Sequence, residues 1–358
     1  MHNPRVLYPL RTRFTIGATL TLFLIAPLVI VSSSAFASDV TVGSPANGSR
    51  VQSPVFVRAL NTGCNGYAPT AFGYAIDEAS EIVPGESAHD IDVTRLPLAE
   101  GKHTLHFRSA TSEGVCPEVS TTFTVASAKD PTTPPSIPAN AVSSGSLDGS
   151  SKWTEQHDGG TPGESKGTMT YPAKTPVYTD ARQFYMTYSD QAGERWSTQF
   201  VRDANATHFV LDTFVLLPSP SELKNLEMDI DQVVASGETV ILSTQCSGEI
   251  GSWEYGDSVG RHDHWKSTKI KCNPAEWAPN VWHHIQIGEH HAPNSDIVTH
   301  DWVTIDGVYN VFEDATLESG HFLEWGAGDI NTQFQIEGAS EGKGTVTAYI
   351  HKLTVYRW

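Results

Sequence analysis

Trp302-Val303-Thr304-Ile305-Asp306-Gly307-Val308-Tyr309-Asn310-Val311 places two runs of strand-forming residues on either side of an Asp-Gly pair. Asp-Gly is the strongest short signal for a β-hairpin, because a type I′ turn needs a positive φ at both of its central positions. Similar short runs, separated by turn residues, recur along the chain, and no segment shows a convincing helical period. The sequence therefore predicts an all-β protein.

Outward from this hairpin, residues 143–358 read as a long series of strands. The clearest candidates are 195–201, 208–217, 226–231, 239–245, 266–271, 282–288 and 345–358. About ten short strands in a segment of this length are typical of a two-sheet jelly roll. We therefore expect the second half of the chain to form one jelly-roll β-sandwich.

The first half of the chain predicts a second, smaller β-sandwich over residues 38–126. Its candidate strands are 54–60, 71–77, 103–107 and 120–125, and turn signals separate them. Regular short strands of this kind indicate a sandwich. Residues 127–142 are rich in Pro, Ser and Thr, so we expect an extended and fairly stiff linker there.

Residues 1–37 have the pattern of a secretion signal. Arg5, Arg11 and Arg13 precede an apolar run over 16–31, and Ala35-Phe36-Ala37 gives a small-x-small cleavage site. The run is short for a membrane span, which needs about 20 apolar residues. We therefore expect a cleaved signal peptide, no membrane span after its removal, and a location outside the cytoplasm: secreted, periplasmic or at the cell surface.

The chain has four cysteines, which allow three pairings. We expect Cys64 to pair with Cys116 and Cys246 with Cys272, because each bridge then lies inside one predicted domain. An exported protein meets the oxidising conditions in which such bridges persist, and each should stabilise the fold by about 2–4 kcal/mol. The absence of any C-x-x-C spacing disfavours a metal site built from these thiolates.

The charge and the motifs exclude several classes of function. The chain has 23 basic and 41 acidic residues, a formal net charge of −18, whereas nucleic-acid binding needs a basic patch. The histidines follow no recognised zinc spacing, and no EF-hand pattern is present. We expect no nucleic-acid partner, no metal and no cofactor, although a structural calcium ion would suit an acidic secreted β-sandwich.

The sharpest constellation of polar residues is Leu226-Glu227-Met228-Asp229-Ile230-Asp231. Alternate residues of a strand share one face, so Glu227, Asp229 and Asp231 should line up together, with Met228 and Ile230 in the core. Three neighbouring carboxylates repel one another and raise at least one pKa. We expect this row to make polar contacts with a ligand.

Aromatic residues gather close to the acidic strand in the sequence. Trp253, Tyr255 and Trp265 lie between the paired Cys246 and Cys272, and glycines flank Trp253 and Tyr255. Sugar rings have apolar faces that stack on aromatic side chains, while nearby polar groups orient their hydroxyls. We expect these three rings to be exposed for stacking, and Gln245 and His264 to orient the hydroxyls; the alternative is that the rings fill the core of the sandwich.

The first half resembles the bacterial immunoglobulin-like domains of exported proteins. The resemblance rests on Ser44-Pro45-Ala46-Asn47-Gly48 leading to Val51, on Gly101-Lys102-His103, and on Phe123-Thr124-Val125. These motifs belong to the framework of such domains. The resemblance therefore implies an immunoglobulin-like β-sandwich that acts as a spacer or accessory module.

The second half resembles the concanavalin A-like lectin/glucanase superfamily, in its laminin-G-type jelly-roll form. Trp282-His283-His284-Ile285, followed after a gap by Val303-Thr304-Ile305-Asp306-Gly307, looks like its paired strands. Leu353-Thr354-Val355-Tyr356 looks like its last strand, which returns beside the first, and this would put the first strand near Trp153. The superfamily holds lectins, glycosidases, lyases and adhesion modules, so the fold alone does not decide function.

The acidic strand is similar to the Glu-x-Asp-x-Glu strand of laminarinase- and lichenase-type glycoside hydrolases. That resemblance implies Glu227 as nucleophile, Asp229 as its hydrogen-bonding helper and Asp231 as acid/base. Those enzymes have Glu at the third position, and Asp231 is shorter by one methylene. A general acid must come within hydrogen-bond reach of the oxygen that it protonates, so this departure favours binding over catalysis.

The leading hypothesis is a secreted or cell-surface, lectin-like protein without catalytic activity. It would bind a polysaccharide or a cell-surface glycan on the concave face of the jelly roll. The alternatives are a glycoside hydrolase acting on a β-glucan, with Glu227, Asp229 and Asp231 as its catalytic residues, and a structural adhesion module that binds protein.

Overall fold

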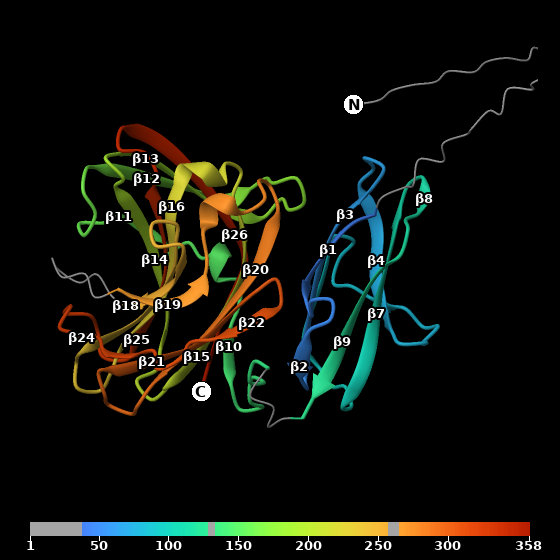
Figure 1. Ribbon diagram of the computed structural model, residues 1–358, viewed down its shortest axis with the longest axis horizontal. Coiled ribbons are helices and arrows are strands. Elements are labelled where there is room, and N and C mark those ends of the chain that lie inside the picture. Colours follow the sequence, from blue (N-terminus) through green and yellow to red (C-terminus); the bar gives the residue numbers. More distant parts are fainter. Residues whose placement is uncertain (1–37, 128–132, 257–264) are drawn as a thin grey trace, which may run out of the picture. The chain divides into compact units, whose positions relative to one another are not determined.

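A computed structural model describes residues 38–127, 133–256 and 265–358 (Figure 1). The signal peptide expected over 1–37 and residues 128–132 of the expected linker lie outside these ranges. The described residues belong to one compact unit and form 26 strands and three short 3₁₀ turns. The 3₁₀ turns are η1 (Leu147–Gly149), η2 (Pro220–Glu222) and η3 (Pro274–Glu276). The predicted all-β class is confirmed.

The first half of the described chain forms a small β-sandwich. One sheet has the order β1 (Ser38–Ser44), β3 (Val55–Cys64), β6 (Asp90–Leu96). The other has the order β2 (Arg50–Gln52), β9 (Val119–Ala126), β7 (Gly101–Thr111), β4 (Pro69–Ile76), β5 (Val83–Pro84), with β8 (Gly114–Val115) paired to β7. Alternating residues such as Leu105 and Phe107 fill the core, and the expected disulfide between Cys64 and Cys116 is present.

The second half forms a larger sandwich of two sheets. The first sheet has the order β12 (Ser165–Ala173), β13 (Ala181–Ser189), β26 (Lys343–Arg357), β15 (His208–Leu216), β20 (Trp282–His291), β21 (Ile297–Ile305), β22 (Val308–Val311), with β10 (Val142–Ser144) on β26 and β23 (Thr316–Glu318) on β21. The second has the order β11 (Thr154–His157), β14 (Gly193–Arg202), β25 (Asp329–Gly338), β16 (Leu223–Val233), β17 (Thr239–Ser247), β18 (Ser252–Gly256), β19 (Lys266–Lys271), with β24 (Gly320–His321) on β17. Apolar residues of both sheets share one core.

The Asp306-Gly307 hairpin forms as predicted. Ile305 pairs with Val308, and φ is 50° at Asp306 and 75° at Gly307, as a type I′ turn requires. The carboxylate of Asp306 also accepts hydrogen bonds from His283 Nδ1 at 2.8 Å and from the His284 backbone N–H at 2.9 Å. The turn is therefore tied to the neighbouring strand β20 as well as closing its own hairpin.

The position expected for the first strand of the jelly roll is wrong. The strand that pairs with β26 from the start of this half is β10, at Val142–Ser144, rather than a strand near Trp153. Trp153 precedes β11, which belongs to the opposite sheet. Its indole is buried in the core and donates a hydrogen bond to the Leu147 carbonyl at 2.8 Å. Trp153 is therefore a core residue, and it does not belong to the first strand of this half.

A buried charge network joins the two sandwiches within the compact unit. Arg58 of β3 lies 3.0 Å from Asp92 and 3.1 Å from Asp212 of β15, and both Arg58 and Asp212 are buried. His284 Nε2 lies 2.9 Å from Asp212, and Gln286 donates to it at 2.7 Å. Burial raises the pKa of Asp212, but the charge of Arg58, the contact with His284 and the hydrogen bond from Gln286 together outweigh it and hold that pKa below its usual value.

Candidate functional site

The acidic row lies on β16, in the middle of the second sheet. Across the ladder, Glu227 pairs with Gln335 and Gln245, and Asp229 with Gln333 and Ser243. Met228 and Ile230, the residues between the acids, are buried in the core. The predicted alternation is therefore confirmed, and Glu227, Asp229 and Asp231 share the face that points away from the core.

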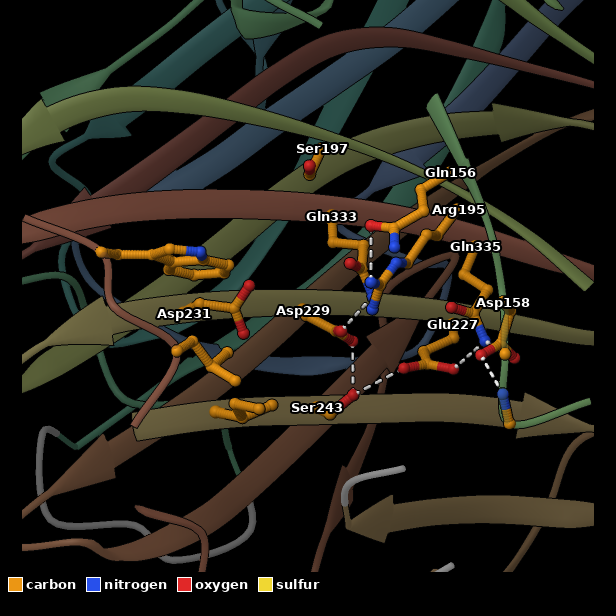
Figure 2. A pocket seen from close by; sticks show the side chains of 15 residues that line it. Gln156, Asp158, Arg195, Ser197, Glu227, Asp229, Asp231, Ser243, Gln333 and Gln335 are labelled. Atoms are coloured by element: carbon orange, nitrogen blue, oxygen red, sulfur yellow. Dashed lines mark hydrogen bonds between the residues drawn. The ribbon is translucent and has the colours of Figure 1, made fainter. Parts of the chain in front are cut away.

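A hollow of about 430 Å³ lies over this face (Figure 2). The residues around it come from five neighbouring strands, β11, β14, β25, β16 and β17, and from the loops after β11 and β24. Its lining consists of Gln156, Asp158, Gly159, Gly160, Arg195, Ser197, Glu227, Asp229, Asp231, Ile241, Ser243, Leu323, Trp325, Gln333 and Gln335. The acidic row thus forms the floor of an open pocket.

Two glutamines of β25 hold the carboxyl groups in place (Figure 2). Gln335 Nε2 donates to Glu227 at 2.8 Å and to Asp158 at 3.1 Å, and Gln333 Nε2 donates to Asp229 at 2.6 Å. The amide hydrogens thus point at the acids. The carbonyl oxygens of these amides, together with the carboxyl oxygens, leave the pocket rich in hydrogen-bond acceptors.

Ser243 connects two of the acids (Figure 2). Its Oγ lies 2.9 Å from Glu227 Oε1 and 2.5 Å from Asp229 Oδ1. A hydroxyl has one hydrogen to donate, so Ser243 serves both carboxyl groups only by sharing that hydrogen between them as a three-centre bond. The two carboxyl groups on the floor of the pocket therefore depend on one donor, whose hydrogen bonds lower the pKa of each.

Burial dominates the electrostatics of the row, because it disfavours the charged form of a carboxyl group. Burial and the charge of Asp158 raise the pKa of Glu227 to about 8. Burial and the charges of Glu227 and Asp231 raise the pKa of Asp229 well above its usual value. Burial raises the pKa of Asp231 to about 7, and the charge of Arg195 opposes that rise.

Asp231 differs from the other two acids of the row in its hydrogen bonding. It lines the pocket and is only 4% exposed, yet no donor within the described residues bonds to its carboxyl group. Arg195, which acts on it through charge, donates to Gln156 Oε1 at 2.7 Å. Asp231 is therefore a buried acceptor that faces the pocket without a hydrogen bond.

An exposed aromatic residue stands at the rim of the pocket. Trp325, in the loop between β24 and β25, is 39% exposed and lines the hollow together with Leu323. Phe322 in the same loop is 74% exposed. The site thus combines a polar floor with a rim of apolar side chains, of which Trp325 is exposed to solvent.

The stacking roles expected for Trp253 and Tyr255 are wrong. Trp253 is 1% exposed, and both rings lie in the hydrophobic core. The segment is the regular strand β18 rather than a loop, and its odd-numbered residues face the core. Glu254 between them is turned the other way and accepts a hydrogen bond from Gln245 at 3.1 Å. The flanking glycines bound this strand and do not expose it.

The remaining predicted site residues do not enter the pocket lining. Gln245 lies on β17 directly opposite Glu227, but its amide donates to Glu254 on the other neighbouring strand, β18. Trp265 is half-buried just before β19. His264 lies outside the described residues. The disulfide between Cys246 and Cys272 is present as expected.

The sequence alone did not predict the pocket residues that lie on other strands and loops, far from β16 along the chain. Asp158, Arg195, Gln333, Gln335 and Trp325 all line the pocket. One usable signal was present: Gln333 and Gln335 alternate with the apolar Phe334 and Ile336, as the acids alternate on β16. Nothing local to Arg195 or Asp158 marks them as neighbours of the acids.

The described ranges contain neither a cluster of candidate metal ligands nor a membrane-spanning helix. Within 38–127, 133–256 and 265–358, no group of three or more His, Cys, Asp or Glu side chains is arranged to hold a metal ion. Nor does any helix in the described part of the chain have the length and apolar character needed to cross a membrane.

The comparisons with known proteins concern the fold. The chain matches no protein-family model and no curated protein. Among solved structures, it is similar to a β-sandwich carbohydrate-binding module of promiscuous specificity, at 10% identity and a TM-score of 0.31, with 89% of this chain and 97% of that one covered. It is also similar to the lectin UEA-II complexed with galactose, at 10% identity and a TM-score of 0.34, with 60% and 97% covered. A third is the alginate lyase vAL-1 from Chlorella virus, at 12% identity and a TM-score of 0.32, with 58% and 93% covered. Likeness at this level does not indicate what this chain binds.

Proposed function

We propose that this protein binds a polysaccharide in the pocket over β16. The observation that carries the proposal is the pairing of a polar floor, made of oriented amides and carboxyls, with the exposed indole of Trp325 at its edge. A sugar ring presents hydroxyl groups around its edge and an apolar face, and sites of this composition satisfy both. The two disulfides are in keeping with an exported protein that meets such polymers outside the cytoplasm.

The accessibility of the pocket also argues against the hypothesis of a protein-binding adhesion module. A structural protein-binding module would be expected to cover or fill the face that carries Glu227 and Asp231. These residues instead line an accessible hollow of about 430 Å³, which is large enough for sugar rings. The geometry therefore favours a glycan over a protein partner at this face.

The experiment is a pull-down of the full chain with insoluble polysaccharides: β-glucans, xylan, pectin, chitin and chitosan. We expect retention on at least one of them that soluble oligosaccharide of the same type releases. Retention on none would overturn the proposal. A reducing-end assay on the same mixtures tests for turnover, and binding without new reducing ends is the expected result.

Glycoside hydrolysis is the second candidate, and one observation favours it. Burial raises the pKa of Glu227 to about 8 and that of Asp231 to about 7, so near neutral pH the row can hold a protonated and an ionised carboxyl together, and hydrolysis needs both forms. In a retaining enzyme the two catalytic carboxyl groups lie about 5–5.5 Å apart, so that the glycosidic bond can lie between them. Glu227 and Asp229 instead both contact the hydroxyl of Ser243, which leaves no room for that bond. Hydrolysis would therefore have to use Asp231 as the acid. New reducing ends that vanish in Glu227→Gln would establish this alternative.

A further inference from the structure

We propose that the glycan bound here carries free amino groups, and that a protonated amine is held against the carboxyl of Asp231. This inference rests on the proposed function and names its substrate class. Three features of the pocket support it: the excess of acidic over basic side chains, the lack of a hydrogen bond to the Asp231 carboxyl from the described residues, and the direction in which two glutamine amides donate.

The charge of the lining is strongly one-sided. Its four acids are Asp158, Glu227, Asp229 and Asp231, and its one cationic side chain among the described residues is Arg195. The acids outnumber the one guanidinium, and like charge and burial raise the pKa of Glu227, Asp229 and Asp231, so a cation beside them would favour their ionised forms. A glycan bearing carboxylate groups would add like charge to a buried acidic site, whereas an ammonium group would offset it.

Asp231 supplies the second, independent observation. It is 4% exposed and aimed into the pocket, and it accepts no hydrogen bond from the described residues. A buried carboxyl without a donor is unfavourable, so a ligand that brings a donor is stabilised there. An ammonium group has three donors and no acceptor, which matches this position better than a hydroxyl does.

The orientation of the glutamines points the same way. Gln333 and Gln335 direct their Nε2 donors at Asp229, Glu227 and Asp158, so these amides offer a ligand their carbonyl oxygens. The carboxylate of a uronate presents only acceptors, and the acetamide of an N-acetylated sugar presents a carbonyl acceptor and one N–H in place of the three donors of an ammonium group. The pocket is therefore suited to the deacetylated form of an amino sugar.

Three β-1,4-linked hexasaccharides with one backbone test this, because they differ only at carbon 2: glucosamine, glucose and N-acetylglucosamine. Their affinities for the full chain are measured by calorimetry at pH 7 and about 0.15 M salt, where charges further apart than about 8 Å are largely screened. We expect the glucosamine hexamer to bind at least about tenfold tighter than the glucose hexamer, the gain typical of a hydrogen bond to a charged group. The N-acetylated hexamer should be weaker than both.

Asp231→Asn should bring the ratio of the glucosamine and glucose affinities close to one. Glu318→Gln is the matched control, since it removes the same charge from an exposed position on β23 outside the pocket and should leave the ratio unchanged. An unchanged unfolding midpoint shows that each variant is folded. If Asp231→Asn does not fold, the ranking of the three sugars by the unaltered chain decides alone.

The outcomes separate this inference from the proposed function. Equal affinity for the glucosamine and glucose hexamers, or tighter binding of polygalacturonate, would overturn the inference and leave polysaccharide binding intact. An equal loss of the amino preference in Asp231→Asn and Glu318→Gln would overturn it too, by showing general attraction to an acidic protein. Binding of no glycan in this set or in the pull-down would overturn both.

Discussion

The carboxyl of Asp229 lies 2.5 Å from the hydroxyl of Ser243 on the floor of the pocket. The same hydroxyl donates to Glu227, and burial and the neighbouring acids raise the pKa of both carboxyl groups, so this pair keeps a proton near neutral pH. The acidic row consequently carries fewer negative charges near neutral pH than its composition suggests. The charge of the acidic row therefore changes with pH near neutrality, and the stability of the protein should change with it.

Removing the shared hydroxyl should destabilise the protein in a pH-dependent way. The Ser243 hydrogen bonds lower the pKa of both Glu227 and Asp229, so they stabilise the ionised forms. We expect Ser243→Ala to lower the free energy of unfolding by about 1–3 kcal/mol at pH 8.5 and by less at pH 5. Urea denaturation at both pH values measures this, and an equal loss at the two would contradict the account.

The raised pKa values also predict how stability changes with pH. Glu227 titrates at about 8 and Asp231 at about 7 in the folded protein, against ordinary values of 4.5 and 3.8. Between about pH 5 and 8 the folded state therefore holds protons that the unfolded state has lost, so this site makes stability fall as pH rises. The charged groups that face the pair are Asp158, Asp229, Glu289, Glu337 and Arg195.

Glu227→Gln should flatten that slope and be more stable than the unaltered chain at pH 8, because an uncharged amide replaces a carboxyl that ionises in a buried site. Thermal unfolding at intervals of half a pH unit gives both slopes. Glu318→Gln, an exposed acid on β23, serves as the control and should keep the original slope. A slope that is the same in all three proteins would show that the acidic row does not titrate in this range.

The rim residue Trp325 should carry much of the affinity for a sugar. We expect Trp325→Ala to weaken binding of the retained oligosaccharide by about tenfold or more, as loss of an aromatic contact of about 1.5 kcal/mol would do. Tyr67→Ala is the control, because Tyr67 is similarly exposed but belongs to the first sandwich. Calorimetric titration of both variants gives the comparison, and a similar affinity in the two would remove Trp325 from the site.

The buried pair Arg58 and Asp212 should matter far more than a surface pair. Arg58→Met leaves Asp212 buried without its main partner, a change that destabilises by about 3–5 kcal/mol. Arg108→Met breaks an exposed pair with Glu118 and should lower stability by about 1 kcal/mol or less. Denaturant unfolding of both variants tests the difference. Comparable losses would mean that the two sandwiches are not held together through Asp212.

The parts of the fold that follow from local sequence could be predicted. The hairpin at Asp306-Gly307 and the shared face of Glu227, Asp229 and Asp231 depend only on turn chemistry and on the two-residue period of a strand. Which face of β18 meets the core depends on its pairing with β17, and so the local reading of Trp253 and Tyr255 as exposed rings failed.

Most of the pocket could not be predicted, because it depends on strand order. Gln335 lies 108 residues from Glu227 in the sequence, and Gln333 lies 104 residues from Asp229. They meet because β25 pairs with β16, a long-range choice that neither strand encodes by itself. The same holds for Arg195, which reaches the site because β14 pairs with β25.

The most direct test of polysaccharide binding at this pocket is a crystal structure of the full chain with the oligosaccharide that the pull-down selects. We predict sugar rings lying over β16 and β25, with one ring against Trp325 and a sugar donor within hydrogen-bond distance of Asp231. An oligosaccharide bound elsewhere, with only water over Glu227, Asp229 and Asp231, would contradict the account.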